Sequence, residues 1–158
     1  MKSDTIAAIA TALSDAGIGI IRISGPEAIA VANRVVVNKK KEHTLKNWQT
    51  HTIHYGFVEE NGTILDEVMV SVMKAPRSYT TEDTVEIKCH GGVLLTKRVL
   101  EAVLHAGARM AEPGEFTKRA FLSGRIDLSE AEAVMDLIQA KNQFSMQASI
   151  KQLRGSVA

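Results

Sequence analysis

The segment "HTIHYGFVEENGTILDEVMVSVMKAP", residues 51–76, restricts the fold of this 158-residue chain more than any other feature. Asn61-Gly62 separates two runs of strand-forming residues. This pair is typical of a two-residue hairpin turn, because both turn positions require a positive φ. Side chains on the second run alternate between two partly apolar faces, Val68, Val70 and Val72 on one and Met69, Ser71 and Met73 on the other. The sequence predicts a hairpin with one face packed on helices, while the other lines a pocket or contacts a partner.

Short strands and helices surround this hairpin in an irregular order. The runs "DTIAAIAT", "GIGIIRIS" and "TVEIKC" are predicted strands. A helix of about three turns is predicted in "SGPEAIAVANRVV", where Ser24 and Glu27 have the spacing of a capping box. A second helix is predicted between Gly91-Gly92 and Gly107. This order favours an α+β fold with a mixed sheet over a doubly wound parallel sheet.

The character of the chain changes near its C-terminal end. Asp127 and Ser129 can each cap a helix, with an acidic residue three positions later. An apolar stripe follows at helical spacing: Leu128, Ala131, Val134, Met135 and Ile138. The sequence supplies no second long helix to cover this stripe, so we expect the start of a truncated helical domain. The predicted division is a first domain at 1–117 and the beginning of an all-α domain at 118–158.

Composition excludes several classes of protein. The formal net charge of +1 gives no general attraction for nucleic acid or anionic membranes. The single cysteine, Cys89, excludes an intramolecular disulfide framework and fits a reducing compartment. Neither a signal-peptide pattern nor an apolar run of membrane-spanning length is present. We therefore expect a cytoplasmic protein.

The common nucleotide and metal motifs are missing from the sequence. No G-x-x-x-x-G-K-[ST] segment occurs, and the glycines of "GIGIIR" precede a strand instead of following it. Gly91-Gly92 could offer N–H groups to an anion, although such a pair is more often a tight turn. His51 and His54 should point to opposite faces of a strand, so they do not form a metal-binding pair. We interpret Cys89 as a small core residue and not as a nucleophile. We expect no catalytic residue and no metal site in this chain.

Three charged residues lie within predicted strands or in a tight turn, where their charge is unexpected. Arg22 lies among isoleucines in "GIIRIS", Glu86 lies within "TVEIKC", and Arg125 occupies the turn between two predicted helices. Taken one at a time, each is most simply a surface residue. Together they suit a small polyanionic ligand with an amidine-like edge, because a carboxylate accepts two parallel N–H bonds and arginines clamp carboxylates.

At "IIRISGPEAI", "CHGG" and "EPGEFTKRAFLSGRIDLSEAEAVMDLI" the chain resembles the N-terminal part of the MnmE (TrmE) family of tRNA-modification GTPases. The last run is long and highly specific. The resemblance implies a folate-binding domain related in fold to the glycine-cleavage T protein, followed by the first helices of a helical domain. It assigns Arg22, Glu86 and Arg125 to a 5-formyltetrahydrofolate or 5,10-methylenetetrahydrofolate ligand. Glu86 would accept from the pterin, and the arginines would position other parts of the ligand.

The resemblance also implies a role in tRNA modification. Family members form homodimers through the N-terminal domain and work with the FAD-dependent protein MnmG. Together they add an aminomethyl or carboxymethylaminomethyl group at C5 of the wobble uridine of tRNA. The GTPase domain, which binds GTP, Mg²⁺ and K⁺, lies outside this sequence, so we expect no GTP hydrolysis by this chain alone.

Two other functions stay open at this point. The chain could be a dimerisation and partner-docking module without functional folate binding. It could also be a stand-alone folate-dependent one-carbon transferase, which would need a general acid or base that the sequence does not show beyond Glu86.

Overall fold

The computed structural model describes residues 4–11 and 17–155, with side chains up to residue 141. The chain divides into two compact units, Met1–Ala111 and Glu112–Ala158. The predicted division lay between residues 117 and 118. The unit boundary falls before the first helix of the second unit, so that helix belongs with the long helix that follows it.

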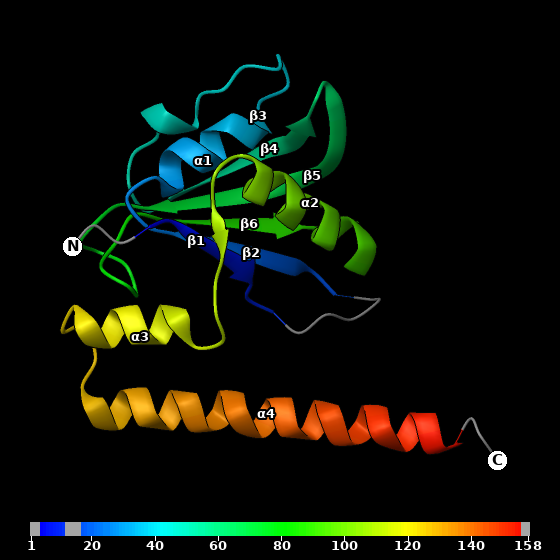
Figure 1. The fold of residues 1–158 in the computed structure, drawn as a ribbon. Coiled ribbons are helices and arrows are strands. Elements are labelled where there is room, and N and C mark those ends of the chain that lie inside the picture. The colour runs from blue at the N-terminus through cyan, green and yellow to red at the C-terminus, as the bar shows by residue number, and fades with distance from the viewer. Residues whose placement is uncertain (1–3, 12–16, 156–158) are drawn as a thin grey trace. The chain divides into compact units, whose positions relative to one another are not determined.

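The described residues of the first unit form a seven-stranded mixed sheet with two α-helices (Figure 1). Its strand order is β3-β4-β5-β6-β2-β1-β7, in which only the β1–β7 pair is parallel. The strands are β1 (Ile6–Ile9), β2 (Gly19–Ser24), β3 (Val36–Val37), β4 (Thr52–Glu60), β5 (Thr63–Met73), β6 (Thr84–Cys89) and β7 (Arg109–Met110). The helices are α1 (Ala28–Val35) and α2 (Val93–His105), with a short 3₁₀ helix η1 (Leu45–Asn47). The predicted α+β fold with a mixed sheet is confirmed.

The predicted hairpin is formed by β4 and β5. Asn61 and Gly62 have φ values of 52° and 79°, as a turn with two left-handed positions requires. The two strands pair along their length, with one register shift between Val58 and Glu59. Val68, Val70 and Val72 are fully buried, whereas the alternate side chains of β5 are partly exposed. The prediction that one face of β5 packs in the core is confirmed, and the pocket or partner role of its other face stays a prediction.

Both helices of the first unit pack on one face of the sheet (Figure 1). The core joins alternate residues of β2, β5 and β6 to the inner faces of α1 and α2. Its strand members include Ile21, Ile23, Val70, Val85 and Ile87, all fully buried. Each such side chain contributes about 1.5–3 kcal/mol on burial, so this two-layer core fixes the register of the central strands.

The start of α1 differs from the prediction. The helix begins at Ala28 and has eight residues, and no side chain caps it. Ser24 is the last residue of β2, so it cannot form a capping box with Glu27. The N–H of Glu27 instead donates to Thr5 Oγ1 (2.8 Å), and the N–H of Gly25 donates to the Asp83 carbonyl (3.0 Å). Tertiary partners replace the local cap that the sequence suggested.

The described part of the second unit contains the helices α3 (Glu115–Leu122) and α4 (Leu128–Gly155). A predicted cap is present at the start of α4, where the N–H of Glu130 donates to Asp127 Oδ1 (2.7 Å) and the N–H of Asp127 donates to Glu130 Oε1 (3.2 Å). The apolar stripe is only partly covered, since Leu128 and Met135 are 56% and 39% exposed, whereas Ala131 is buried. Among the described residues, no helix has the apolar length needed to cross a membrane.

Candidate ligand site on the sheet

Arg22 and Glu86 lie directly opposite each other on the neighbouring antiparallel strands β2 and β6. Nε and Nη2 of Arg22 both lie 2.9 Å from Oε2 of Glu86. The side chains are 32% and 22% exposed, so the pair is neither in the core nor fully in water. The structure therefore brings together two of the three predicted ligand residues.

The pair lies on the face of the sheet opposite α1 and α2. Their neighbours along the strands, Ile21 and Ile87, are in the helix-covered core, and side chains alternate between faces. Strand register places the pair in a row across the sheet with Ile53, Ser71 and Ala8. Within the first unit, no described helix covers this face. It is a surface on which a flat ligand could lie against the sheet.

The ion pair leaves part of the Glu86 carboxylate available. Both nitrogens of Arg22 contact Oε2, and no described residue forms a hydrogen bond with Oε1 of Glu86. An oxygen held in this way can accept N–H groups from a ligand, while the guanidinium beside it can contact an anionic or carbonyl group. This donor and acceptor set fits the edge of a pterin ring, which carries adjacent N–H groups and a carbonyl.

Arg125, the third predicted ligand residue, belongs to the second unit. It follows Gly124, whose φ of 81° allows the chain to turn after α3. The Arg125 N–H donates to the carbonyl of Ala120 (2.9 Å), which closes the end of the helix, and the side chain is exposed. Arg125 thus lies in the turn that joins the two helices of the second unit, as the sequence predicts.

Comparison with known proteins identifies the family. Residues 5–125 match the family model described as "GTP-binding protein TrmE N-terminus". This chain belongs to the TrmE (MnmE) family. It is 61% identical over 99% of its length to the tRNA modification GTPase MnmE of Lachnoclostridium phytofermentans, and 55% identical over its full length to that of Listeria welshimeri. The MnmE of Streptococcus thermophilus is 56% identical over 98% of the chain. The chain spans about a third of the length of these curated relatives.

A buried polar network lies beside the ion pair in this TrmE-type domain. Ser24, two residues after Arg22, forms hydrogen bonds with Thr80 Oγ1 (2.7 Å) and Glu82 Oε1 (2.9 Å). Ser24 and Thr80 are essentially unexposed, so these bonds fix the loop of residues 77–83 to the end of β2. The segment "RSYTTED" is polar, and no local pattern in the sequence indicates that it closes on Ser24.

The Gly91-Gly92 turn is occupied by a carboxylate of the chain itself. The N–H groups of His90 and Gly91 donate to Oδ2 of Asp66 on β5 (2.8 and 3.1 Å). Gly92 has a φ of 91° and leads into α2. The tight-turn interpretation therefore fits better than an external anion site.

Cys89 and the histidines do not form a reactive centre in the described part of the TrmE-type domain. Cys89 is fully buried, and burial, with a smaller effect from the Asp66 charge, raises its thiol pKa to about 12. No group of three His, Cys, Asp or Glu residues that could hold a metal ion occurs among the described residues. The expectation that Cys89 is a core residue is confirmed.

Proposed function

We propose that the first unit binds a reduced folate through Arg22 and Glu86. The observation that carries this proposal is the partly exposed Arg22–Glu86 ion pair in the middle of the open face of the sheet. A structural ion pair alone contributes little at such exposure, typically about 0–1 kcal/mol. Apolar residues such as isoleucine or valine would be equally suitable for these two neighbouring positions on the central strands if the role were structural alone. Ligand binding explains why both positions carry charged side chains instead.

The roles of the residues follow from their chemistry. Glu86 Oε1 accepts N–H groups of the pterin edge, and Arg22 holds Glu86 in place and faces a carbonyl or anionic group of the ligand. Arg125 is the third residue that the family resemblance assigns to 5-formyltetrahydrofolate or 5,10-methylenetetrahydrofolate. A methylene-tetrahydrofolate supplies a one-carbon unit when it is bound.

The role of the chain in the complete protein is also part of the proposal. The relatives are named tRNA modification GTPases, and this chain corresponds to the N-terminal third of them. We propose that it supplies the folate and dimerisation part of a protein that modifies wobble uridine together with the FAD-dependent MnmG. GTP, Mg²⁺ and K⁺ would be bound by the segment that the relatives have and this sequence lacks.

Dimerisation is supported by apolar side chains on the same open face of the sheet. Ile53 and Tyr55 of β4 are 58% and 46% exposed, and Met69 lies opposite Tyr55 on β5. A contiguous apolar surface of this kind is typical of a contact between proteins. The same observation favours the second candidate function, a dimerisation and docking module that does not bind folate.

Calorimetric titration with 5-formyltetrahydrofolate separates the two functions. Folate binding predicts saturable heat with the unmodified chain and a large loss with Glu86→Gln. Absence of heat at high protein concentration, with the dimer intact by sedimentation, would leave the docking module as the better account.

A further inference from the structure

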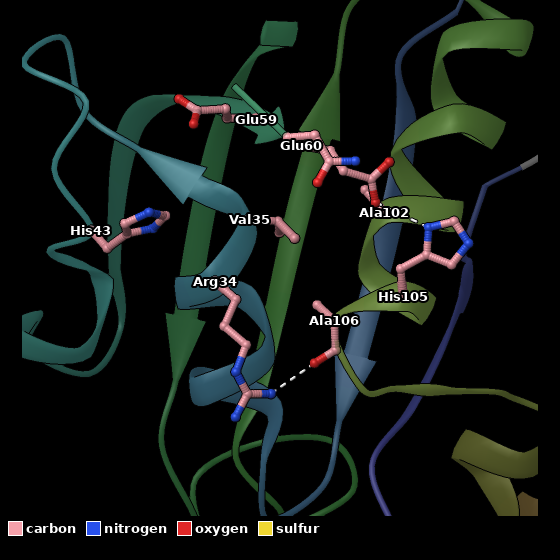
Figure 2. A pocket seen from close by; sticks show the side chains of 9 residues that line it. Arg34, Val35, His43, Glu59, Glu60, Ala102, His105 and Ala106 are labelled. Carbon is pink, nitrogen blue, oxygen red and sulfur yellow. Dashed lines mark hydrogen bonds and ion pairs between the residues drawn. The ribbon is translucent and has the colours of Figure 1, made fainter. Parts of the chain in front are cut away.

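A pocket of about 270 Å³ lies at the edge of the first unit, on the side of the sheet that carries the helices (Figure 2). Its walls come from the last turns of α1 and α2, the tip of the β4–β5 hairpin, and His43 in the loop after β3. Arg22 and Glu86 lie on the opposite face of the sheet. This pocket is therefore separate from the proposed folate site, and nothing that follows depends on folate binding.

The ends of two helices give the pocket a preference for positive charge. Both helices finish there, and the C-terminal end of a helix carries a partial negative charge and unpaired carbonyl groups. Two side chains of the protein already use these carbonyls. Nη1 of Arg34 donates to the Ala106 oxygen (2.7 Å), and Nδ1 of His43 contacts the carbonyl oxygens of Asn33 and Val36. Cationic and N–H groups are thus the natural partners of this region.

The two carboxylates at the hairpin tip have different surroundings. Glu60 is paired with Arg98 and His105, whose hydrogen bonds lower its pKa. Glu59 also lines the pocket, but its Oε2 is buried and has no hydrogen-bond partner among the described residues. Figure 2 shows Glu60 on the side of His105 and Glu59 directed away from Glu60. Oδ1 of Asn33 also lacks a hydrogen-bond partner among the described residues, but Asn33 does not line the pocket.

We propose that this pocket binds a small organic cation, a primary ammonium or guanidinium group on a short aliphatic stem, with Glu59 as its anionic partner. Such a group has N–H donors and no acceptor, so it matches the unsatisfied oxygen of Glu59. A buried acceptor without a partner is costly, and an entering donor removes that cost. Val35 and Ala102 provide apolar surface for the methylene groups. The volume lies just below the range of about 300–1,000 Å³ of drug-sized ligands, which favours a diamine-sized molecule over a nucleotide.

The same chemistry has two sources, a free diamine or a lysine or arginine side chain of another protein. The test is an NMR titration of the 158-residue chain with 1,4-diaminobutane, and separately with a blocked lysine whose α-amino group is acetylated and whose carboxyl group is amidated. The neutral 1,4-butanediol is the ligand control. If the pocket binds the amine, the backbone amide resonances of the hairpin tip and of the last turn of α1 should show saturable chemical-shift changes. Tighter binding of the diamine assigns the site to a free amine, and tighter binding of blocked lysine assigns it to a protein side chain.

Two variants test the role of Glu59. Glu59→Gln keeps the size of the side chain and removes its charge, and it should weaken amine binding roughly tenfold to a hundredfold. Glu132→Gln removes the same charge from an exposed position on α4 and should leave binding unchanged. Ala106→Leu narrows the pocket without changing charge and should also weaken binding. Absence of shifts with both amines, equal shifts with 1,4-butanediol, or unchanged affinity of a folded Glu59→Gln variant would overturn the proposal.

Discussion

Oε2 of Glu86 accepts from both Nε and Nη2 of Arg22, each at 2.9 Å, across the β2–β6 strand pair. One oxygen of the carboxylate is thus committed to the protein, and the other is held in a fixed position. A ligand that approaches the open face meets an oriented acceptor beside a guanidinium. Preorganisation of this kind reduces the entropy that binding would otherwise cost.

Replacing Glu86 with glutamine should weaken 5-formyltetrahydrofolate binding by roughly a hundredfold or more. The variant keeps the shape but exchanges an acceptor for an N–H₂ donor, and charge-assisted hydrogen bonds contribute about 1.5–3 kcal/mol each. Stability should change by only about 0–1 kcal/mol, because the pair with Arg22 is partly exposed. Calorimetry measures the affinity, after circular dichroism has established the fold.

Lys88→Ala is the matched control for this prediction. Lys88 lies on the same strand and the same face, two residues from Glu86, and it is opposite Ile20 and Met69. Its removal should change folate affinity little. Equal affinity of Glu86→Gln and the unmodified chain would mean that the ion pair is an ordinary surface contact.

Arg125 should behave as a point charge toward the ligand. Arg125→Ala should weaken folate binding, whereas Arg125→Lys should restore a good part of the affinity, because lysine keeps the charge and loses only the forked geometry. The side chain is exposed and its backbone N–H carries the structural bond to Ala120, so both variants should fold. Equal affinities of all three proteins in the same titration would remove Arg125 from the site.

The hairpin and the core strands could be predicted because their signals are local. Asn61-Gly62 requires a turn, and the alternation of Val68, Val70 and Val72 identifies the buried face. The cap at Asp127 was also predictable, since both of its partners lie within four residues. These are features for which a short stretch of sequence contains both halves of the interaction.

The arrangement of the site could not be predicted in the same way. Arg22 and Glu86 are 64 residues apart, and their contact depends on the register of β2 against β6, which no local pattern specifies. The missing capping box at α1 has a similar cause, because Thr5, from a different strand region, takes the Glu27 N–H. Asp66 at the Gly91 turn is a third case, in which a distant strand provides the anion.

Cys89 should be unreactive toward thiol reagents in the folded protein. Its side chain is fully buried and its pKa is raised from 9.0 to about 12, so almost no thiolate is present at pH 8. A disulfide reagent followed by absorbance should label Cys89 slowly in buffer and rapidly in denaturant. Rapid labelling under both conditions would show that the thiol is accessible.

The same pKa shift predicts a loss of stability at alkaline pH. The folded state keeps the proton up to about pH 12, whereas the unfolded thiol ionises near its ordinary value of 9.0. The unfolded state therefore binds fewer protons between these values, and the free energy of unfolding should fall as the pH rises through this range. Cys89→Ala should lose this part of the pH dependence in denaturant titrations, and an identical slope in both proteins would argue against the shift.

The chain alone should not hydrolyse GTP. Its sequence has no glycine loop with the lysine and hydroxyl that hold phosphates and magnesium. At the Gly91-Gly92 turn between β6 and α2, the N–H groups of His90 and Gly91 already donate to Asp66. Phosphate release from purified protein should equal the buffer blank with Mg²⁺ and K⁺ present, and saturable turnover from clean protein would contradict this expectation.

The chain should form a dimer through the open face of the sheet, so Ile53→Lys should shift it toward the 17.2 kDa monomer in sedimentation experiments. Ile53 is 58% exposed, so the substitution removes little core packing, while a lysine would have to be desolvated in an apolar contact. Leu94→Lys is the control, since Leu94 is 83% exposed on α2, on the side of the sheet that carries the helices. If only monomer is seen for the unmodified chain at tens of micromolar, or if Leu94→Lys dissociates the dimer as well as Ile53→Lys does, the open face is not the interface.

Because Ile53 lies in the same cross-sheet row as Arg22 and Glu86, a dimer on this face would place the second copy beside the ion pair. Folate titration of Ile53→Lys then shows whether the ligand site needs the partner.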